Sequence, residues 1–113
     1  MHELSIAMNI LEIVQEECRK AGSEKVVELI LEVGDLSGVD VEALTTCLQI
    51  ASRETLLDGA SMVINRHPGK GYCGKCGEEF VMEDILSLCP FCFQPAVELR
   101  EGQEMRIEEI SVK

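Results

Sequence analysis

The sequence is poor in aromatic residues. It has no tryptophan, and its one tyrosine and three phenylalanines all lie between residues 72 and 93, a span that also holds four of the six cysteines. The overall hydrophobic fraction of 46% is ordinary and permits a compact core. A chain of 113 residues suits one small domain with an appendage. The clustering predicts that residues 72–93 belong to a small module with its own chemistry.

Basic residues are also scarce. Ten Lys and Arg stand against 21 Asp and Glu, which gives a formal net charge of -11. Such a surface repels phosphate backbones and anionic lipid and favours cations or basic partners. The segment 69–100, which contains the cysteine pairs, holds only three basic residues: Lys70, Lys75 and Arg100. We therefore expect no nucleic-acid partner.

Long apolar runs are absent. No run approaches the roughly 20 residues that a membrane span needs. The first residues lack a basic region and interleave apolar residues with glutamates, unlike a signal peptide. We therefore expect a cytoplasmic protein without a membrane partner. In such a reducing compartment, cysteines are more often metal ligands or catalytic groups than disulfides.

Apolar periodicity predicts two helices. The first covers residues 4–21 and ends at Gly22, and the second follows Asp40 as its N-cap. Eleven positions at helical spacing form the expected buried stripes: Leu4, Ala7, Met8, Leu11, Val14 and Cys18 in the first helix, and Val41, Leu44, Cys47, Leu48 and Ala51 in the second. The two cysteines in these stripes are predicted to be small buried hydrophobes.

Three segments with period-two alternation predict strands: 26–34, 61–68 and 104–112. In the first of these, Val27 and the alternate residues after it are expected to share a face. A change of phase at Glu108–Glu109 suggests a β-bulge. A strand–helix–strand unit favours a parallel pair. The order of elements predicts an α+β fold with two helices packed on a small mixed three-stranded sheet. The cysteine module is inserted between the last two strands and projects from one end of the sheet, as an enlarged hairpin loop would.

The four cysteines of the module form two CxxC pairs, Cys73 with Cys76 and Cys89 with Cys92, separated by twelve residues. Two such turns can direct four thiolates at one ion in a closed tetrahedral site, with Zn–S distances of about 2.3 Å. Zinc is the default metal for this donor set, and iron is the alternative. A closed site leaves no position for water, so we expect a structural zinc that holds the zinc-ribbon-like module together. Two disulfides or a redox pair is the remaining alternative.

No catalytic motif is recognisable. Neither histidine belongs to a nucleophile motif, and His67, beside Pro68 at a strand end, is expected to have a surface or packing role. The sequence therefore predicts a protein that is not an enzyme. An adaptor whose zinc ribbon binds other proteins is one function of this kind.

The start of the chain offers a second metal site. The α-amine of Met1, the amide nitrogen of His2 and the Nδ1 of His2 can close fused five- and six-membered chelate rings. This flat, nitrogen-rich arrangement suits Ni(II) or Cu(II) and suits tetrahedral zinc poorly. A fourth donor must come from elsewhere, for instance the backbone nitrogen of Glu3. Histidine also follows methionine by chance, so the motif alone does not establish a site.

Several segments together resemble the HypA/HybF family of hydrogenase nickel-incorporation proteins. In chain order they read MHELSIAMNIL, VGDLSGVDVEAL, DGASMVINRHP, CGKCG, CPFC and GQEMRIEEISV. The resemblance runs over nearly the whole chain, and the MHE start combined with the zinc module makes it specific. Two positions depart from the family pattern: Phe93 stands where many members have glycine, and EMRI stands where ELRI-like sequences are usual.

The resemblance implies a nickel metallochaperone. Its nickel-binding α/β domain would comprise residues 1–68 and 101–113, and its zinc-binding domain residues 69–100. Nickel, as transferred cargo, would be bound by the amine of Met1, the backbone nitrogens of His2 and Glu3 and the His2 side chain. The structural zinc ligands would be the four module cysteines: Cys73, Cys76, Cys89 and Cys92.

The resemblance also implies protein partners. They are a hydrogenase maturation GTPase and the large subunit of a [NiFe]-hydrogenase, with urease maturation proteins as a further candidate class.

Overall fold

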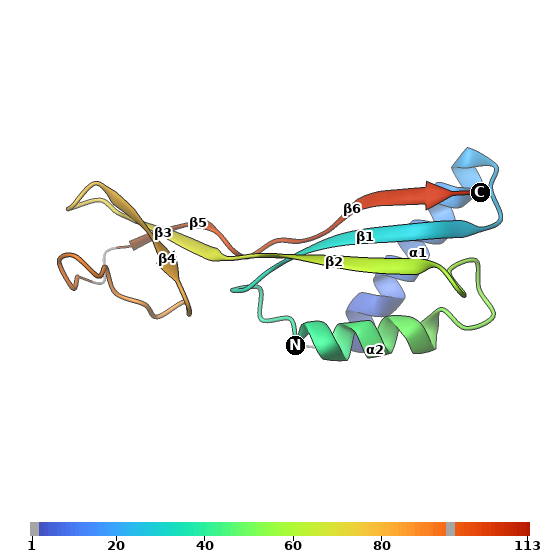
Figure 1. The fold of residues 1–113 in the computed structure, drawn as a ribbon, viewed down its shortest axis with the longest axis horizontal. Helices are drawn as coiled ribbons and strands as arrows, with labels where there is room; N and C mark the ends of the chain where they lie inside the picture. The colour runs from blue at the N-terminus through green and yellow to red at the C-terminus, as the bar shows by residue number, and fades with distance from the viewer. Residues whose placement is uncertain (1–2, 95–96) are drawn as a thin grey trace.

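The computed structural model describes residues 3–94 and 97–113, and in it the chain forms two three-stranded sheets joined end to end (Figure 1). The molecule is elongated, with principal extents of 54 × 24 × 17 Å. We call the part with the helices the helical lobe and the part with the second sheet the cysteine lobe. No helix among the described residues is long and apolar enough to cross a membrane.

The helical lobe contains five elements: α1 (Glu3–Ala21), β1 (Val26–Gly34), α2 (Val41–Ala51), β2 (Ser61–His67) and β6 (Met105–Val112). Its sheet has the order β2-β1-β6, with β2 parallel and β6 antiparallel to β1. Both helices pack on one face of this sheet, and their apolar stripes form one core with β1 (Figure 1). The predicted α+β fold with a mixed three-stranded sheet is confirmed.

The termini of the helices follow the predicted signals. Asp40 caps α2 because its side chain accepts a hydrogen bond of 3.1 Å from the Ala43 backbone nitrogen. Gly22, which follows α1, adopts φ +69°, a conformation that glycine takes without strain. In β6 the pairing with β1 skips Glu108, so the predicted bulge is present at that residue.

Three details differ from the prediction. Leu4 and Met8 of α1 are exposed, and Ile10 is buried in the stripe instead. Val27 also faces outward, because an irregularity in the β1–β6 register turns Val26 rather than Val27 into the core. The cysteine module is inserted between β2 and β6 and projects from one end of the sheet as predicted (Figure 1), but the comparison with a hairpin loop is wrong, because β2 and β6 lie on opposite edges of β1.

The cysteine lobe contains β3 (Gly69–Cys73), β4 (Glu78–Met82) and β5 (Val97–Glu101), in the antiparallel order β4-β3-β5. Its small core consists of Phe80 and Met82 from β4 together with Cys73 and Cys89. The chain runs almost directly from β2 into β3, and it returns from β5 into β6 (Figure 1). The predicted division into a nickel-binding domain, residues 1–68 and 101–113, and a zinc-binding domain, residues 69–100, stays a prediction.

Three glycines pack where the two sheets meet, a region we call the neck. A Cβ on Gly34 would lie 2.0 Å from the carbonyl oxygen of Gly102, and one on Gly69 would lie 2.6 Å from the carbonyl oxygen of Met82. Backbone hydrogen bonds join the end of β1 and the residues after it to the link between β5 and β6: the Gly34 amide donates to the Glu104 carbonyl and the Leu36 amide to the Gly102 carbonyl, both at 2.7 Å. Because these glycines have no Cβ, the backbones come into contact at the neck and the Leu36 side chain packs against them.

Candidate metal centres

The four cysteines of the module converge in the cysteine lobe. All four Sγ atoms lie within 4.8 Å of one another. The Sγ atoms of Cys73 and Cys92 are 3.6 Å apart, and those of Cys76 and Cys89 are 4.0 Å apart. A tetrahedron with Zn–S bonds of about 2.3 Å has S–S edges of about 3.8 Å, so these separations fit a four-thiolate zinc site.

The two CxxC turns share one backbone geometry. In each turn the amide of the fourth residue after the first cysteine donates to that cysteine's carbonyl: Gly77 to Cys73 and Phe93 to Cys89, both at 2.8 Å. The donor residue has a positive φ in both turns, +71° at Gly77 and +59° at Phe93. The turns are therefore near repeats that present two pairs of sulfurs to one point.

The electrostatics of the cluster favour a cation. Backbone amides of Cys76 and Lys75 lower the pKa of the Cys73 thiol to about 7. A hydrogen bond with Cys92, followed by burial, raises the pKa of Cys76 to about 12. One thiolate therefore forms readily and the next does not, because negative charge accumulates among the sulfurs. A divalent cation would remove that repulsion.

The disulfide alternative is not seen among the described cysteines, all six of which are free. The Sγ atoms of Cys73 and Cys92 are 3.6 Å apart, far more than the S–S bond length of roughly 2.05 Å in a disulfide. Cys18 is buried, and Cys47 is half-buried against the core of the helical lobe, as predicted. Burial raises the pKa of the Cys18 thiol, which makes it a poor nucleophile.

Of the predicted nickel ligands, Met1 and His2 lie outside the described residues. Glu3 begins α1, and its Oε2 accepts a hydrogen bond of 3.1 Å from the backbone nitrogen of Asp40, the N-cap of α2. This contact joins the start of α1 to the start of α2. The carboxylate also lies near the positive end of a helix dipole, which stabilises its charge.

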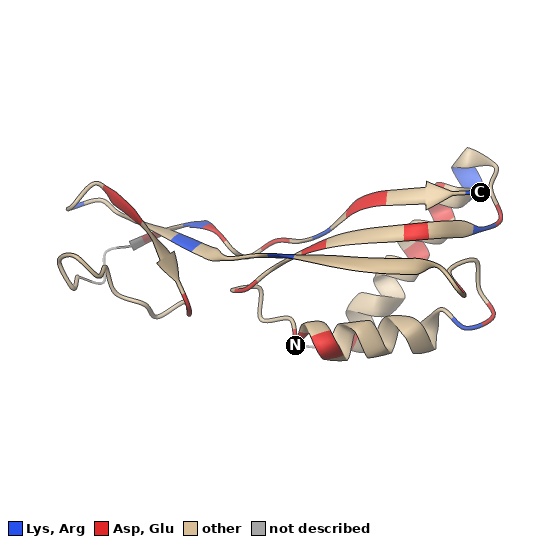
Figure 2. Cartoon of the chain, viewed as in Figure 1, with Lys and Arg blue, Asp and Glu red and all other residues tan. Residues whose placement is uncertain are grey.

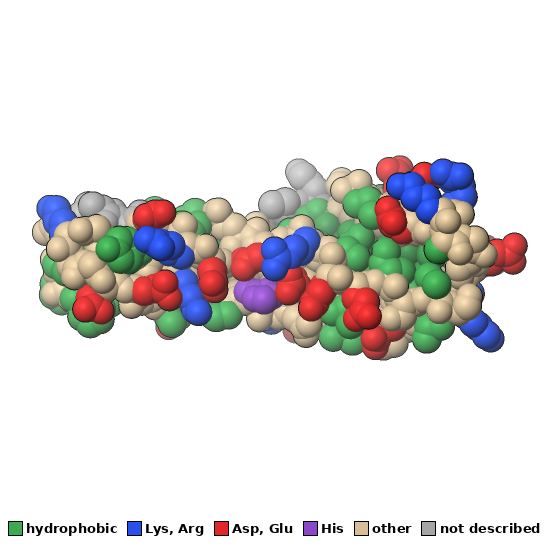
Figure 3. All heavy atoms as spheres, turned by 90° about the horizontal axis from the view of Figure 1, so that it is seen from above, with side chains coloured by type: hydrophobic (Ala, Val, Ile, Leu, Met, Phe, Trp, Pro, Cys, Tyr) green, Lys and Arg blue, Asp and Glu red, His purple; other side chains and the backbone are tan. Residues whose placement is uncertain are grey.

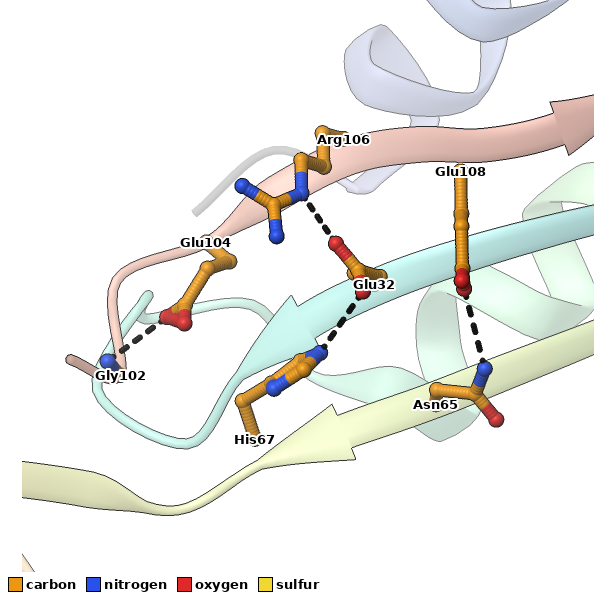
Figure 4. A network of polar contacts seen from close by, with 7 residues as sticks. All are labelled: Glu32, Asn65, His67, Gly102, Glu104, Arg106 and Glu108. Atoms are coloured by element: carbon orange, nitrogen blue, oxygen red, sulfur yellow. Dashed lines mark hydrogen bonds and ion pairs between the residues drawn. The ribbon is translucent and has the colours of Figure 1, made fainter.

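His67 takes part in a network that the sequence did not reveal (Figure 4). Its Nε2 lies 3.2 Å from Oε1 of Glu32, whose other carboxylate oxygen accepts a hydrogen bond from Nε of Arg106. Glu32 is only 13% exposed, and the hydrogen bond from Arg106 lowers its pKa. The three side chains come from β2, β1 and β6, so they link all three strands of the sheet near the neck. Only the strand register brings them together.

Charged side chains of both signs cluster around the neck, and acidic residues occur along both lobes (Figures 2 and 3). The fold and the four-sulfur site define a class: two-lobed α+β proteins that carry a four-cysteine centre able to hold a metal ion such as zinc. The model of the family described as "Hydrogenase/urease nickel incorporation, metallochaperone, hypA" matches residues 1–112. The chain belongs to this family of nickel-incorporation metallochaperones.

Curated relatives and solved structures agree with this assignment. The chain is 40% identical to "Hydrogenase maturation factor HypA" of Geobacter metallireducens and 42% identical to that of Chlorobaculum parvum, over 113 residues and the full length of each. The fold matches the solution structure of the Ni metallochaperone HypA from Helicobacter pylori with a TM-score of 0.69 at 21% identity, covering 99% of this chain and 97% of that one. A second solution structure, of HypA protein, gives a TM-score of 0.71 at 20% identity, covering 100% and 97%.

Proposed function

We propose that the chain binds one Ni(II) at its N-terminus and delivers it during the maturation of a [NiFe]-hydrogenase. The observation that carries this proposal is the family match over residues 1–112, which includes the MHE start. The donors would be the amine of Met1, the backbone nitrogens of His2 and Glu3, and the His2 side chain. Such a site is planar, and Ni(II) favours this geometry.

Release of the metal follows from the same geometry. A planar site leaves two open faces, so ligands of an acceptor protein can approach before the first donors leave. The hydrogen bond from the Asp40 amide to the Glu3 carboxylate supports this arrangement, because it ties the side chain of the last proposed donor residue to a helix end of the folded lobe.

The cysteine cluster has a different role in this proposal. Cys73, Cys76, Cys89 and Cys92 would hold a zinc ion that is not transferred, and the tetrahedral spacing of their sulfurs supports this. When bound, the zinc supplies binding free energy for folding. The cation would offset the repulsion among the four thiolates, and four thiolate ligands leave no position for a substrate water. The chain would therefore act without catalysis.

Membership of this family implies two partners for the proposed delivery. One is the large subunit of the hydrogenase, which receives the nickel, and the other is a maturation GTPase that works with the chain. Urease maturation proteins are a further candidate, because the family description names hydrogenase and urease together.

The test is a His2→Ala variant in cells that make the hydrogenase. We expect hydrogenase activity to fall and excess nickel in the medium to restore it. His67→Ala is the matched control, since His67 is the only other histidine and is engaged with Glu32. Full activity in the His2→Ala cells would contradict nickel delivery from the N-terminus and favour a zinc-ribbon adaptor instead.

A further inference from the structure

The loop that follows β4, residues 83–94, exposes an unusual amount of apolar surface. Five of its large apolar side chains are 49–83% exposed: Ile85, Leu86, Leu88, Phe91 and Phe93. We call this segment the apolar loop. It lies at the end of the molecule that is remote from the helices, where hydrophobic side chains reach the surface (Figures 1 and 3). Concentrated exposure of this kind marks an interaction site more often than scattered apolar residues do.

Phe93 adds an independent observation. It has φ +59°, a left-handed conformation that costs a residue with a Cβ roughly 1–2 kcal/mol. The equivalent position of the other CxxC turn is Gly77, which adopts the same conformation without that cost. Phe93 is also 71% exposed, so packing within the lobe offsets little of the strain. The left-handed backbone closes the CxxC turn, but glycine would do this without strain, so the exposed aromatic side chain has no evident benefit for the fold and points to a role in binding.

The charges beside the loop define the chemistry of the partner. Four carboxylates at the two ends of β4 make no ion pair within the described part of the chain: Glu78, Glu79, Glu83 and Asp84. Acidic residues at both ends of this strand are visible in Figure 2. By contrast, Glu98 and Glu101 on β5 pair with Arg100 and Lys70. In the lobe that carries the apolar loop, these four carboxylates outnumber Lys75, the one basic residue of its described part without an ion pair, and so they complement an apolar pocket surrounded by Lys and Arg.

The same charges argue against other occupants. A second copy of the chain would bring the same carboxylates together, and each copy carries a net charge of -11. Anionic lipid would be repelled as well.

We propose that the apolar loop docks into a basic-rimmed apolar pocket on the nickel-free precursor of the hydrogenase large subunit, with Phe93 as an anchor. This inference rests on the proposed function, which makes that precursor the acceptor. Docking at the cysteine lobe leaves the open faces of a nickel site at the other lobe free for transfer. The loop therefore supplies recognition, and the N-terminus supplies the metal.

The test measures binding of the zinc-loaded full chain to the purified precursor by calorimetry. Phe93→Gly should weaken binding about 30-fold, as loss of an aromatic anchor does. The same change relieves the backbone, so thermal stability and zinc content should be kept or improved, and loss of folding cannot explain the result. Ile50→Ser is the matched control, because Ile50 is 53% exposed on α2 of the helical lobe and should leave binding unchanged.

A second variant tests the charges. Glu79→Lys with Glu83→Lys should weaken binding and reduce its dependence on salt concentration. Equal binding by wild type and Phe93→Gly, or an equal loss in Ile50→Ser, would overturn the docking proposal and leave nickel delivery standing. Absence of binding by the wild type would overturn both. Self-association or binding to anionic vesicles that Phe93→Gly abolishes would assign the loop to those occupants and overturn the proposal too.

Discussion

Removal of the metal from the four-cysteine cluster is expected to unfold the cysteine lobe and leave the helical lobe folded. Among the described residues of the cysteine lobe, the buried apolar side chains other than the ligands are Phe80 and Met82, with Leu36 and Leu99 packed partly buried against them. Burial of Phe80 and Met82 contributes about 1.5–3 kcal/mol each. Zinc binding to a site of this type contributes about 10–16 kcal/mol in small modules, so a bound zinc would be the larger stabilising contribution. The helical lobe has twelve buried core residues of its own and does not need it.

The assay is amide NMR of the full chain before and after a strong chelator. Signals from β3 and β4 should collapse to the shifts of an unfolded chain, while those of β1 and α2 should remain dispersed. Cys89→Ala should give the same pattern without chelator. Cys47→Ala is the control, because Cys47 is half-buried in the other lobe and outside the cluster. Dispersed β3 and β4 signals in the metal-free protein would refute the reasoning.

Two further changes test the neck and the network beside it. Gly34→Ala should destabilise the protein by about 3 kcal/mol in urea unfolding, because its Cβ would lie 2.0 Å from the Gly102 carbonyl oxygen. Gly74→Ala, with open space around its Cβ, should change little; equal effects would contradict the account of the neck. The hydrogen bond from Arg106 lowers the pKa of Glu32, so this group stabilises the fold above its unfolded pKa of about 4.3, and the contribution is lost as pH falls through the lower folded pKa. As the pH falls through this range, the urea midpoint of the wild type should fall more steeply than that of Glu32→Gln. Parallel plots of urea midpoint against pH for the two proteins would argue against a stabilising Glu32–Arg106 pair.

Periodicity was sufficient to predict the elements of the helical lobe. The apolar spacing of α1 and α2 and the alternation in β1 reflect burial on one face, which depends mainly on local sequence. The bulge at Glu108 was also predictable, because an extra residue shifts the alternating pattern. The convergence of four cysteines followed from two CxxC pairs, whose spacing is dictated by the geometry of the metal.

The second sheet and the neck were not predictable in the same way. Pro68 and the glycines of β3 disfavour a strand by local propensity, yet Gly69 lies in one and allows a close backbone approach at the neck. That requirement arises from a strand far along the chain, so no local pattern carries it. The His67–Glu32 contact likewise depends on the parallel register of β1 and β2, which alternation alone does not fix. The strain at Phe93 was hidden because phenylalanine gives no sign of a left-handed backbone.

The most direct test of nickel binding at the N-terminus is a Ni(II) titration, followed by calorimetry and absorbance, of two forms of the chain. One form has its native start, and the other carries one extra residue before Met1. The extra residue removes the amine from its place beside His2 while leaving the fold and the cysteine cluster intact. The account predicts saturable binding of one equivalent by the native form and its loss in the extended form. Equal nickel binding by both forms would contradict it.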